Sequence, residues 1–384
     1  MAPGKTPFWR SAKNLNLIVQ LFVLIIIITT MIYLGSNLSR NFQRLGLDFG
    51  FDFLGRTASF DIVNAPLDYS ASDSYSKAIV VGLLNSLKVM FLGIIAASVL
   101  GVSVGVARLS DNWLVSRLAS IYIELLRNTP LLLQLFFWYF AVFLKLPKIE
   151  NAINLGNRIF LSNRGLSLPW VEIDLQTTLA LFLVFGAVLG IVICWQQRTK
   201  GLGLQGSSGQ NWLYLMFASV LVAILAFFLG VTWSMPQYVD NTISGGMNLS
   251  PELATLLIGL SVYTASFIAE VVRAGIQSVD KGQWEAARAL GLESGLVMQL
   301  IVFPQALRVM IPPLTSEFLN LAKNSSLAIA IGYNDVYAIS NTISNQTGKA
   351  VEILLILIFI YLSINLIISL LMNWINKSVQ LKER

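Results

Sequence analysis

The sequence has no histidine, a single cysteine and few charged residues. Of its 384 residues, 12% are Asp, Glu, Lys or Arg and 55% are hydrophobic, whereas an ordinary soluble domain is about 25% charged. A soluble chain of this length buries one or two cores and covers them with charged side chains, which are too few here. The composition therefore excludes an ordinary soluble protein.

The lack of histidine and the single cysteine exclude most catalytic and metal sites. Histidine is the usual side-chain base near neutral pH and the commonest metal ligand. Cys194 alone can form neither a disulfide framework nor a thiolate metal cluster. We therefore expect no catalytic residue and no metal site, and an enzyme is the least favoured class of function.

The apolar residues fall in blocks of about 20, the length that crosses a hydrocarbon core of about 30 Å. We predict an all-α integral membrane protein with about eight transmembrane helices. No small-residue cleavage site follows the first block, so we expect it to remain as an anchor. The predicted spans are 15–35, 79–107, 117–143, 176–196, 212–232, 251–272, 308–332 and 351–375.

Two pairs of glycines inside these spans have the small-xxx-small spacing that lets two helices approach closely. They are Gly101 with Gly105 and Gly186 with Gly190. Because glycine is also common in membrane helices, each pair is equally well explained by that general preference.

The connections indicate an orientation. Lys and Arg are more numerous in the inside connections if both termini are cytoplasmic. The net charge of +6 is then explained by cytoplasmic loops that face anionic lipid, and no basic run with interleaved aromatics indicates nucleic-acid binding. We expect 36–78 and 144–175 to lie outside and the Gly- and Ser-rich connection 197–211 to be a flexible linker.

One polar stretch between two predicted spans carries strong local signals. Asp280, with Gln283 three residues later, is typical of a helix N-cap and its reciprocal partner. A short helix is expected over 281–290, with Gly291 as its left-handed C-terminal cap.

A second short helix is expected from 293 to 303, where Pro304 would end it. The two helices would form a corner on the cytoplasmic side. Ala286 and Ala287 would leave a bare face for a partner protein, and Glu285 would offer a carboxylate to a cation or helix N-terminus of that partner.

This stretch resembles the EAA loop of ABC-importer permeases. The match consists of Glu-Ala-Ala at 285–287, then Gly291, Ile301 and Pro304, with Phe303 where that family usually has leucine.

Three further segments are similar to amino-acid permeases of the histidine/glutamine/glutamate type. They are 124–137, 263–276 and 323–327. The resemblance covers 79–143 and 251–375, and it implies the five-helix core of a type I importer permease.

The rest of the chain departs from the short family pattern and is similar to the long subunits of general L-amino-acid permeases. The resemblance implies five parts: an anchor helix and external segment (1–78), the first part of the core (79–143), an insertion with two extra helices (144–250), the second part of the core with the coupling loop at about 279–304 (251–375), and a cytoplasmic tail (376–384).

The resemblance also implies partners. Two permease chains, favoured as a heterodimer over a homodimer, would form the path in a bacterial plasma (inner) membrane. ATPase subunits would use ATP and Mg²⁺, an external or periplasmic protein would deliver the amino acid, and this chain would bind no cofactor and no ATP. The residues expected to couple to the ATPase are Glu285, Ala286, Ala287, Gly291 and Pro304.

Polar residues inside spans are expensive and usually face a cavity or a partner. Glu270 and Arg273 lie one turn apart and are predicted to pair, mainly as a structural brace. Pro312 and Pro313 are expected to bend the helix that carries most of the remaining polar groups. The candidate substrate-path residues are Glu317, Asn320, Lys323, Asn324, Ser325, Ser326 and Lys88.

Two other functions are weighed against an ABC importer. An ion-coupled secondary amino-acid transporter would need inverted repeats and broken helices near the midplane, and the sequence shows neither by inspection. A membrane scaffold without transport activity would leave the polar segment 317–326 as an unexplained energetic cost.

Overall fold

The computed structural model describes residues 12–45, 48–63, 65–156, 158–172, 174–204, 210–239 and 242–379. Within these residues, seven helical stretches are long and apolar enough to cross a membrane, and Leu131–Lys145 is a shorter apolar helix. The predicted helical membrane protein is therefore confirmed. The long helices are α1 (Ala12–Leu45), α2 (Tyr75–Arg108), α5 (Leu175–Leu204), α6 (Gln210–Gly230), α7 (Pro251–Gln277), α10 (Phe303–Asn324) and α12 (Ala350–Val379).

Shorter helices complete the bundle and its connections. They are α3 (Trp113–Arg127), α4 (Leu131–Phe136), α8 (Lys281–Ala289), α9 (Ser294–Val297), α11 (Val336–Thr347), the π-helical turns Phe137–Val142 and Met298–Val302, and the 3₁₀ segments η2 (Asp52–Gly55), η4 (Phe143–Lys145), η5 (Ile149–Asn151) and η7 (Ser325–Ile331). The predicted five-span core consists of α2, α3 with α4, α7, α10 and α12, which pack against one another.

The pairing of α2 with α7 is the most extensive helix contact in the core. Gly101 and Gly105 lie at this crossing. A methyl group on Gly101 would stand 2.6 Å from Ile268 Cβ, and one on Gly105 would stand 2.7 Å from the Ala269 carbonyl oxygen. This glycine pair therefore permits the close approach that its spacing predicted. A methyl group on Gly186 would meet nothing within 4 Å, and one on Gly190 would stand 3.3 Å from the Ser219 hydroxyl oxygen of α6, so the second pair does not form so close a crossing.

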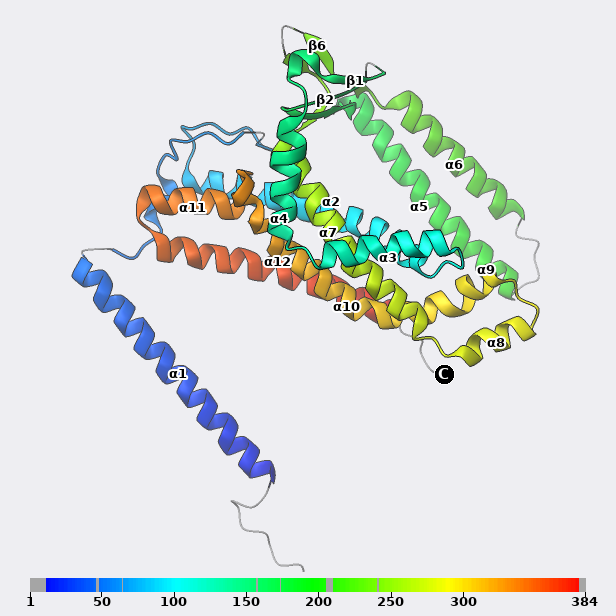
Figure 1. The fold of residues 1–384 in the computed structure, drawn as a ribbon, viewed down its shortest axis with the longest axis horizontal. Helices are drawn as coiled ribbons and strands as arrows, with labels where there is room; N and C mark the ends of the chain where they lie inside the picture. The colour runs from blue at the N-terminus through cyan, green and yellow to red at the C-terminus, as the bar shows by residue number, and fades with distance from the viewer. Residues whose placement is uncertain are drawn as a thin grey trace, which may run out of the picture.

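The prediction of one continuous span over 117–143 is wrong. The chain breaks between α3 and α4, and Figure 1 shows α4 running at a steep angle to α3. Pro130 is the residue before α4, and proline lacks the N–H that would continue the helix. Gln134 stabilises the break, because its amide nitrogen donates to the carbonyl oxygens of Leu126 and Thr129, each at 3.0 Å.

Pro304 does not end a helix, so the prediction that the second short helix stops at Pro304 is wrong. The π-helical turn Met298–Val302 passes directly into α10, and Pro304 lies in the first turn of α10. A missing N–H breaks no helical hydrogen bond in that turn. Pro312 and Pro313 lie inside α10 as expected.

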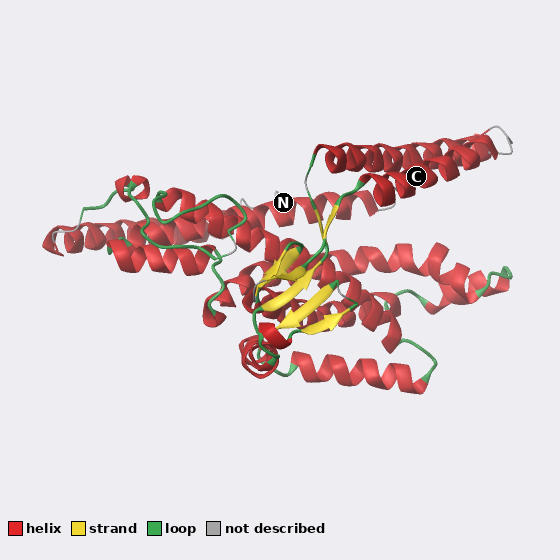
Figure 2. Ribbon diagram, turned by 90° about the horizontal axis from the view of Figure 1, so that it is seen from above, coloured by secondary structure: helices red, strands yellow, loops and turns green. Residues whose placement is uncertain are grey.

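The two connections on either side of α5 and α6 form small antiparallel sheets that the sequence did not predict. β1 (Ile153–Leu155), β2 (Ile159–Ser162), β3 (Gly165–Leu168) and β8 (Met247–Leu249) form one sheet in that order. Smaller pairs join β4 (Trp170–Val171) with β5 (Trp233–Ser234) and β6 (Gln237–Val239) with β7 (Thr242–Ser244). In Figure 1 the strands lie beyond the upper ends of α4 and α5, here called the sheet end, and Figure 2 looks onto the strands from above.

Helices α5 and α6 pack on each other and stand beside the core (Figure 1). Residues 197–204 are part of α5, so the flexible linker predicted over 197–211 is wrong for that half. Its part at 205–209 lies outside the described residues.

The segment after α1 is folded onto the bundle. Phe53, Ala58 and Ile62 are buried in one cluster with residues of α2, α11 and α12. Glu352, at the start of α12, is fully buried; it accepts a hydrogen bond from the Gly50 backbone N–H at 3.2 Å and forms an ion pair with the Lys349 ammonium at 3.3 Å. Helix α1 itself stands apart from the bundle (Figure 1), and its residues 15–35 are exposed.

Candidate functional site

The corner formed by α8 and α9 lies at the opposite end of the core from the sheet (Figure 1), here called the loop end. The predicted N-cap is confirmed, because Asp280 Oδ1 accepts a hydrogen bond from the Gly282 N–H at 2.6 Å. Gln283 does not act as the reciprocal partner; its side-chain oxygen instead accepts from Gln305 at 3.4 Å. The capped start of α8 thus follows closely on the end of α7.

The predicted left-handed cap is also present. Gly291 has φ 78°, and the N–H groups of Gly291 and Leu292 donate to the carbonyl oxygens of Arg288 and Ala287 at 2.9 and 3.3 Å. These two bonds define a Schellman motif, which turns the chain sharply at the end of α8.

The two alanines of the Glu-Ala-Ala sequence face different surroundings. Glu285 and Ala286 are exposed, but Ala287 is only 3% exposed. Ala287 packs in a cluster with Val279, Val302 and other core residues, so its methyl group is not available to a partner. The structure therefore corrects the expectation that both alanines form a bare outer face.

The exposed surface of the corner is partly apolar. Leu290 is 81% exposed at the end of α8. Leu296, Leu300 and Phe303 are exposed along the segment that runs from α9 to the start of α10. Pro304 is exposed as well. Isolated exposed apolar side chains need no explanation, but a group of them on one short segment is typical of a protein–protein contact.

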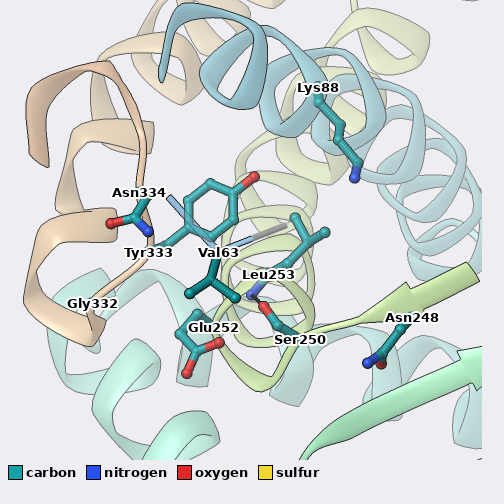
Figure 3. A pocket seen from close by; sticks show the side chains of 9 residues that line it. All are labelled: Val63, Lys88, Asn248, Ser250, Glu252, Leu253, Gly332, Tyr333 and Asn334. Carbon is teal, nitrogen blue, oxygen red and sulfur yellow. Dashed lines mark hydrogen bonds between the residues drawn. The ribbon is translucent and has the colours of Figure 1, made fainter. Parts of the chain in front are cut away.

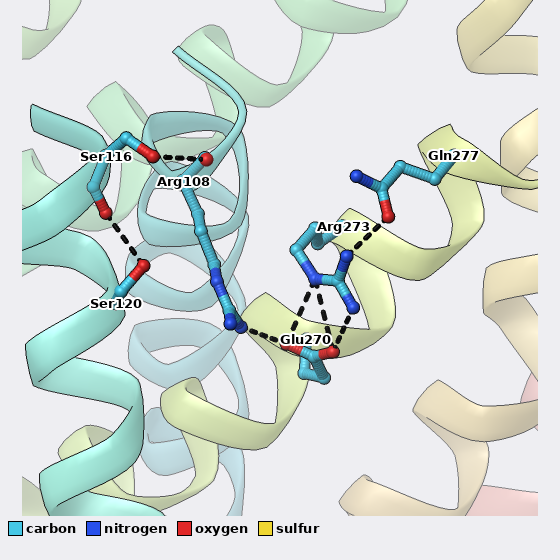
Figure 4. A network of polar contacts seen from close by, with 6 residues as sticks. All are labelled: Arg108, Ser116, Ser120, Glu270, Arg273 and Gln277. Carbon is cyan, nitrogen blue, oxygen red and sulfur yellow. Dashed lines mark hydrogen bonds and ion pairs between the residues drawn. The ribbon is translucent and has the colours of Figure 1, made fainter. Parts of the chain in front are cut away.

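An ion-pair network lies in the core near the loop end (Figure 4). The Arg273 side chain donates to both oxygens of Glu270, as the one-turn spacing predicted, and also bonds the side-chain oxygen of Gln277. Arg108, the last residue of α2, contacts the other side of Glu270. Arg108 lies 162 positions from Glu270, and sequence reasoning did not identify it as a partner.

The broken helix places further charges beside this network. Arg127, at the end of α3, lies with its guanidinium 5.0 Å above the centroid of the Phe267 ring, a cation–π arrangement. A pocket of about 320 Å³ is lined by Arg127, Glu124, Glu270 and Arg108, among others. Positive and negative side chains thus meet in one solvent-accessible space within the core.

Two of the predicted path residues lie near the same charges. Glu317 is half-buried, lies beside Asn320 and is close enough to Arg127 for the two charges to interact. Tyr263 is close to both Arg127 and Glu317. These groups come from α3, α7 and α10, so the tertiary fold, not the sequence, brings them together.

Lys323 and Ser326 face a different space. Together with Tyr337 and Tyr361 they line an open, mostly apolar groove of about 310 Å³ beside α12. Ser325 is buried, and its hydroxyl donates to the Ala322 carbonyl oxygen at 2.9 Å within its own turn. Asn324 is half-buried at the end of α10.

Lys88 lies in a third space, a cavity of about 170 Å³ below the sheet (Figure 3). It shares this cavity with Glu252 in the first turn of α7, and Tyr139 donates to Glu252 Oε1 at 3.0 Å. The structure therefore does not bring the seven predicted path residues into one site, and their role in transport stays a prediction.

One buried carboxyl outside the predicted spans was not identified from the sequence. Asp335 is 1% exposed and caps α11 through a hydrogen bond from the Ala338 N–H at 2.8 Å. Its second oxygen is buried as well, and the Tyr361 side chain lies close to the carboxyl group. Burial raises the pKa of Asp335 to about 7.

Among the described residues, no three Asp, Glu or Cys side chains cluster as metal ligands would. The pocket lined by Arg108, Arg127 and Glu270 offers partners for charged groups of either sign.

Comparison with known proteins gives consistent matches. The family model for the binding-protein-dependent transport system inner membrane component matches residues 90–381. The protein YhdX of Escherichia coli strain K12, whose name describes an amino-acid ABC transporter permease, is 44% identical over 95% of this chain and 94% of its own length.

Two more relatives match over nearly the whole chain. The general L-amino acid transport system permease protein AapQ of Rhizobium johnstonii is 40% identical over 97% of this chain and 94% of its own length. The glutamate/glutamine/aspartate/asparagine transport system permease protein BztB of Rhodobacter capsulatus is 38% identical over 96% of this chain and 94% of its own.

Proposed function

The chain belongs to the family of binding-protein-dependent transport system inner membrane components, and from that premise we propose that it is the permease subunit of an ATP-driven amino-acid importer. The observation that carries the proposal is full-length similarity to amino-acid permeases, combined with a rigid, exposed corner at one end of the core. The same family relationship disfavours the ion-coupled secondary transporter.

The corner is the site where ATPase subunits bind; the loop end is cytoplasmic, and so are the two chain termini. Support comes from its construction: Glu285, Ala286 and Leu290 are exposed, while Trp284 and Ala287 pack against core residues of α7 and α10. A partner that moves α8 therefore moves both attached membrane helices as a rigid body. Gly291 and Pro304 set the turn and the helix start on which this geometry depends.

The amino acid crosses near the break between α3 and α4. A broken helix within the membrane is tolerated where it lines a cavity, and the nearby pocket contains both carboxylates and guanidinium groups. A zwitterionic substrate carries an ammonium and a carboxylate, so this pairing of charges suits it. Glu317 and Asn320 extend the polar surface along α10.

Three kinds of partner complete the importer. An external amino-acid-binding protein delivers substrate at the sheet end, ATPase subunits use ATP and Mg²⁺ at the loop end, and a second, related permease chain forms the other half of the path. This chain contributes no ATP site, and the assembled complex is the ATP-driven translocase of a bacterial inner membrane.

Replacement of Glu285 by Lys tests the coupling role. The variant is expected to lose ATPase association or to hydrolyse ATP without amino-acid uptake, because the exposed carboxylate becomes a cation at the contact. Glu293→Lys is the matched control, since Glu293 is exposed in the same loop and makes no side-chain cap bond. Wild-type uptake by the Glu285→Lys complex would refute this role.

Gentle purification through a C-terminal tag, followed by mass spectrometry, tests the partners. We expect an ATPase subunit and a second permease chain in the purified complex. Recovery of this chain with an ATPase but without a different permease would replace the heterodimer by a homodimer.

A further inference from the structure

The cavity below the sheet has charged groups of opposite sign that do not neutralise each other (Figure 3). Lys88 comes from α2, Glu252 from the start of α7, and Tyr333 and Asn334 from the connection between η7 and α11. In Figure 3 the Lys88 ammonium and the Glu252 carboxylate lie on different sides of the cavity. No ion pair joins them within the part of the chain that the structure describes.

Lys88 is half-buried inside a membrane-spanning helix, and none of the described residues forms a hydrogen bond or ion pair with its ammonium group. A charge in such a helix is costly unless it faces water or a partner. The cavity is where this ammonium can find either one. Glu252 is held in place because Tyr139 donates to one of its oxygens, which leaves the other oxygen for a ligand.

We propose that this cavity is an outer binding site for an α-amino acid. The amino acid occupies the cavity before it reaches the pocket at the break between α3 and α4. Lys88 pairs with the α-carboxylate, and Glu252 accepts hydrogen bonds from the α-ammonium group. This assignment rests on the proposed function, and it adds a second binding site that lies closer to the external face.

The remaining lining indicates which part of the substrate is recognised. Asn248, Ser250 and Asn334 are neutral, while Val63 and Leu253 are apolar. Apart from Lys88 and Glu252, no charged side chain among the described residues lines the cavity to select a substrate side chain. The volume of about 170 Å³ suits a small solute, since a cavity of about 150 Å³ binds benzene. The site therefore recognises the groups that all α-amino acids share.

Protection of a cysteine at the cavity rim tests the site directly. Val63 lines the cavity and is 71% exposed, whereas Leu67 is 46% exposed in the same segment and does not line it. Val63→Cys and Leu67→Cys are each made with Cys194→Ser in the complete importer. The measured quantity is the rate at which a methanethiosulfonate reagent modifies each cysteine, with and without saturating L-glutamine.

L-Glutamine is expected to slow modification of Val63→Cys about tenfold, the change that nine-tenths occupancy produces, and to leave Leu67→Cys unchanged. N-acetyl-glutamine and glutamine methyl ester each lack one of the charges, so neither should protect. Adding Lys88→Met, which keeps the length and removes the charge, should abolish protection. Lys148→Met, at an exposed lysine outside the cavity, should not.

Absence of protection at Val63→Cys overturns the proposal, as does equal protection by the two derivatives or protection that survives Lys88→Met. Amino-acid uptake by the same cysteine complexes is measured in parallel. Uptake without protection refutes only the outer site, whereas absence of uptake of any amino acid by the wild-type complex refutes the proposed function itself.

Discussion

Replacing Gly101 or Gly105 with Ala should separate α2 from α7. At Gly101 the new methyl group would stand 2.6 Å from Ile268 Cβ, about 0.8 Å closer than an ordinary contact of 3.4 Å. At Gly105 it would meet the Ala269 carbonyl oxygen at 2.7 Å. Neither neighbour is the flexible end of a side chain, so the helices themselves must move.

Overpacking of this kind costs about 1–3 kcal/mol, while alanine gains about 0.5–1 kcal/mol over glycine inside a helix. Each substitution should therefore lower the free energy of unfolding by up to about 2.5 kcal/mol. Both glycines lie at the same crossing, so one separation of the helices relieves both clashes. The double variant should then lose less than the sum of the two single losses.

Thermal unfolding of the purified complex in detergent measures the effect, and Gly186→Ala is the matched control. Gly186 lies in a membrane helix, and a methyl group added there would meet nothing within 4 Å. The control should therefore be neutral or slightly stabilising. The reasoning is refuted if Gly101→Ala melts like the wild type, or if Gly186→Ala is equally damaging.

Two further predictions concern charged residues. Burial raises the pKa of Asp335 to about 7 from its ordinary 3.8. Between these two values the Asp335 carboxyl is protonated in the folded chain and ionised in the unfolded chain. The stability of the complex should therefore fall as pH rises from about 4 to 7, by at most about 1.4 kcal/mol per pH unit. Asp335→Asn should flatten this slope in melting curves, and Asp280→Asn, at an exposed helix cap, should retain it; an unchanged slope in Asp335→Asn would contradict the assignment. Lys323→Ala should reduce uptake while the complex remains assembled on size-exclusion chromatography, and loss of assembly would make Lys323 structural.

Local signals predicted the corner at the loop end well. A side chain that accepts from an N–H two residues later and a glycine with positive φ are properties of a few neighbouring residues, so Asp280 and Gly291 could be identified directly. The orientation of α8 could not, because only the packing of α7 and α10 decides that Ala287 faces inward.

Hydropathy located the membrane helices but not the break in the third one. The polar residues Arg127, Asn128 and Thr129 precede Pro130 and are a local signal of the break, but the side-chain bonds from Gln134 that stabilise it are visible only in three dimensions. The small sheets were missed for a related reason. Their strands are only two to four residues long, and two of the pairs, β3 with β8 and β4 with β5, join residues from opposite sides of the α5–α6 insertion.

The contacts of the charged core depend on long-range pairing as well. Glu270 with Arg273 was predictable because the residues lie one turn apart. Arg108 and Arg127 come from other helices, and no pattern within a single segment marks them as neighbours of Glu270. The sequence identified Lys88 only as a charge in a span. Only the cavity that both residues line shows that Glu252 lies near it.

The hydrogen bond from Gly50 to Glu352 joins residues 302 positions apart, and this has a consequence for the order of synthesis. Glu352 lies at the start of the last membrane helix, so the segment that follows α1 lacks this hydrogen bond until the ribosome has made nearly the whole chain. Until then, Phe53 and Ile62 lack the α12 residues that cover them. A nascent chain that stops before α12 therefore leaves part of this apolar surface uncovered.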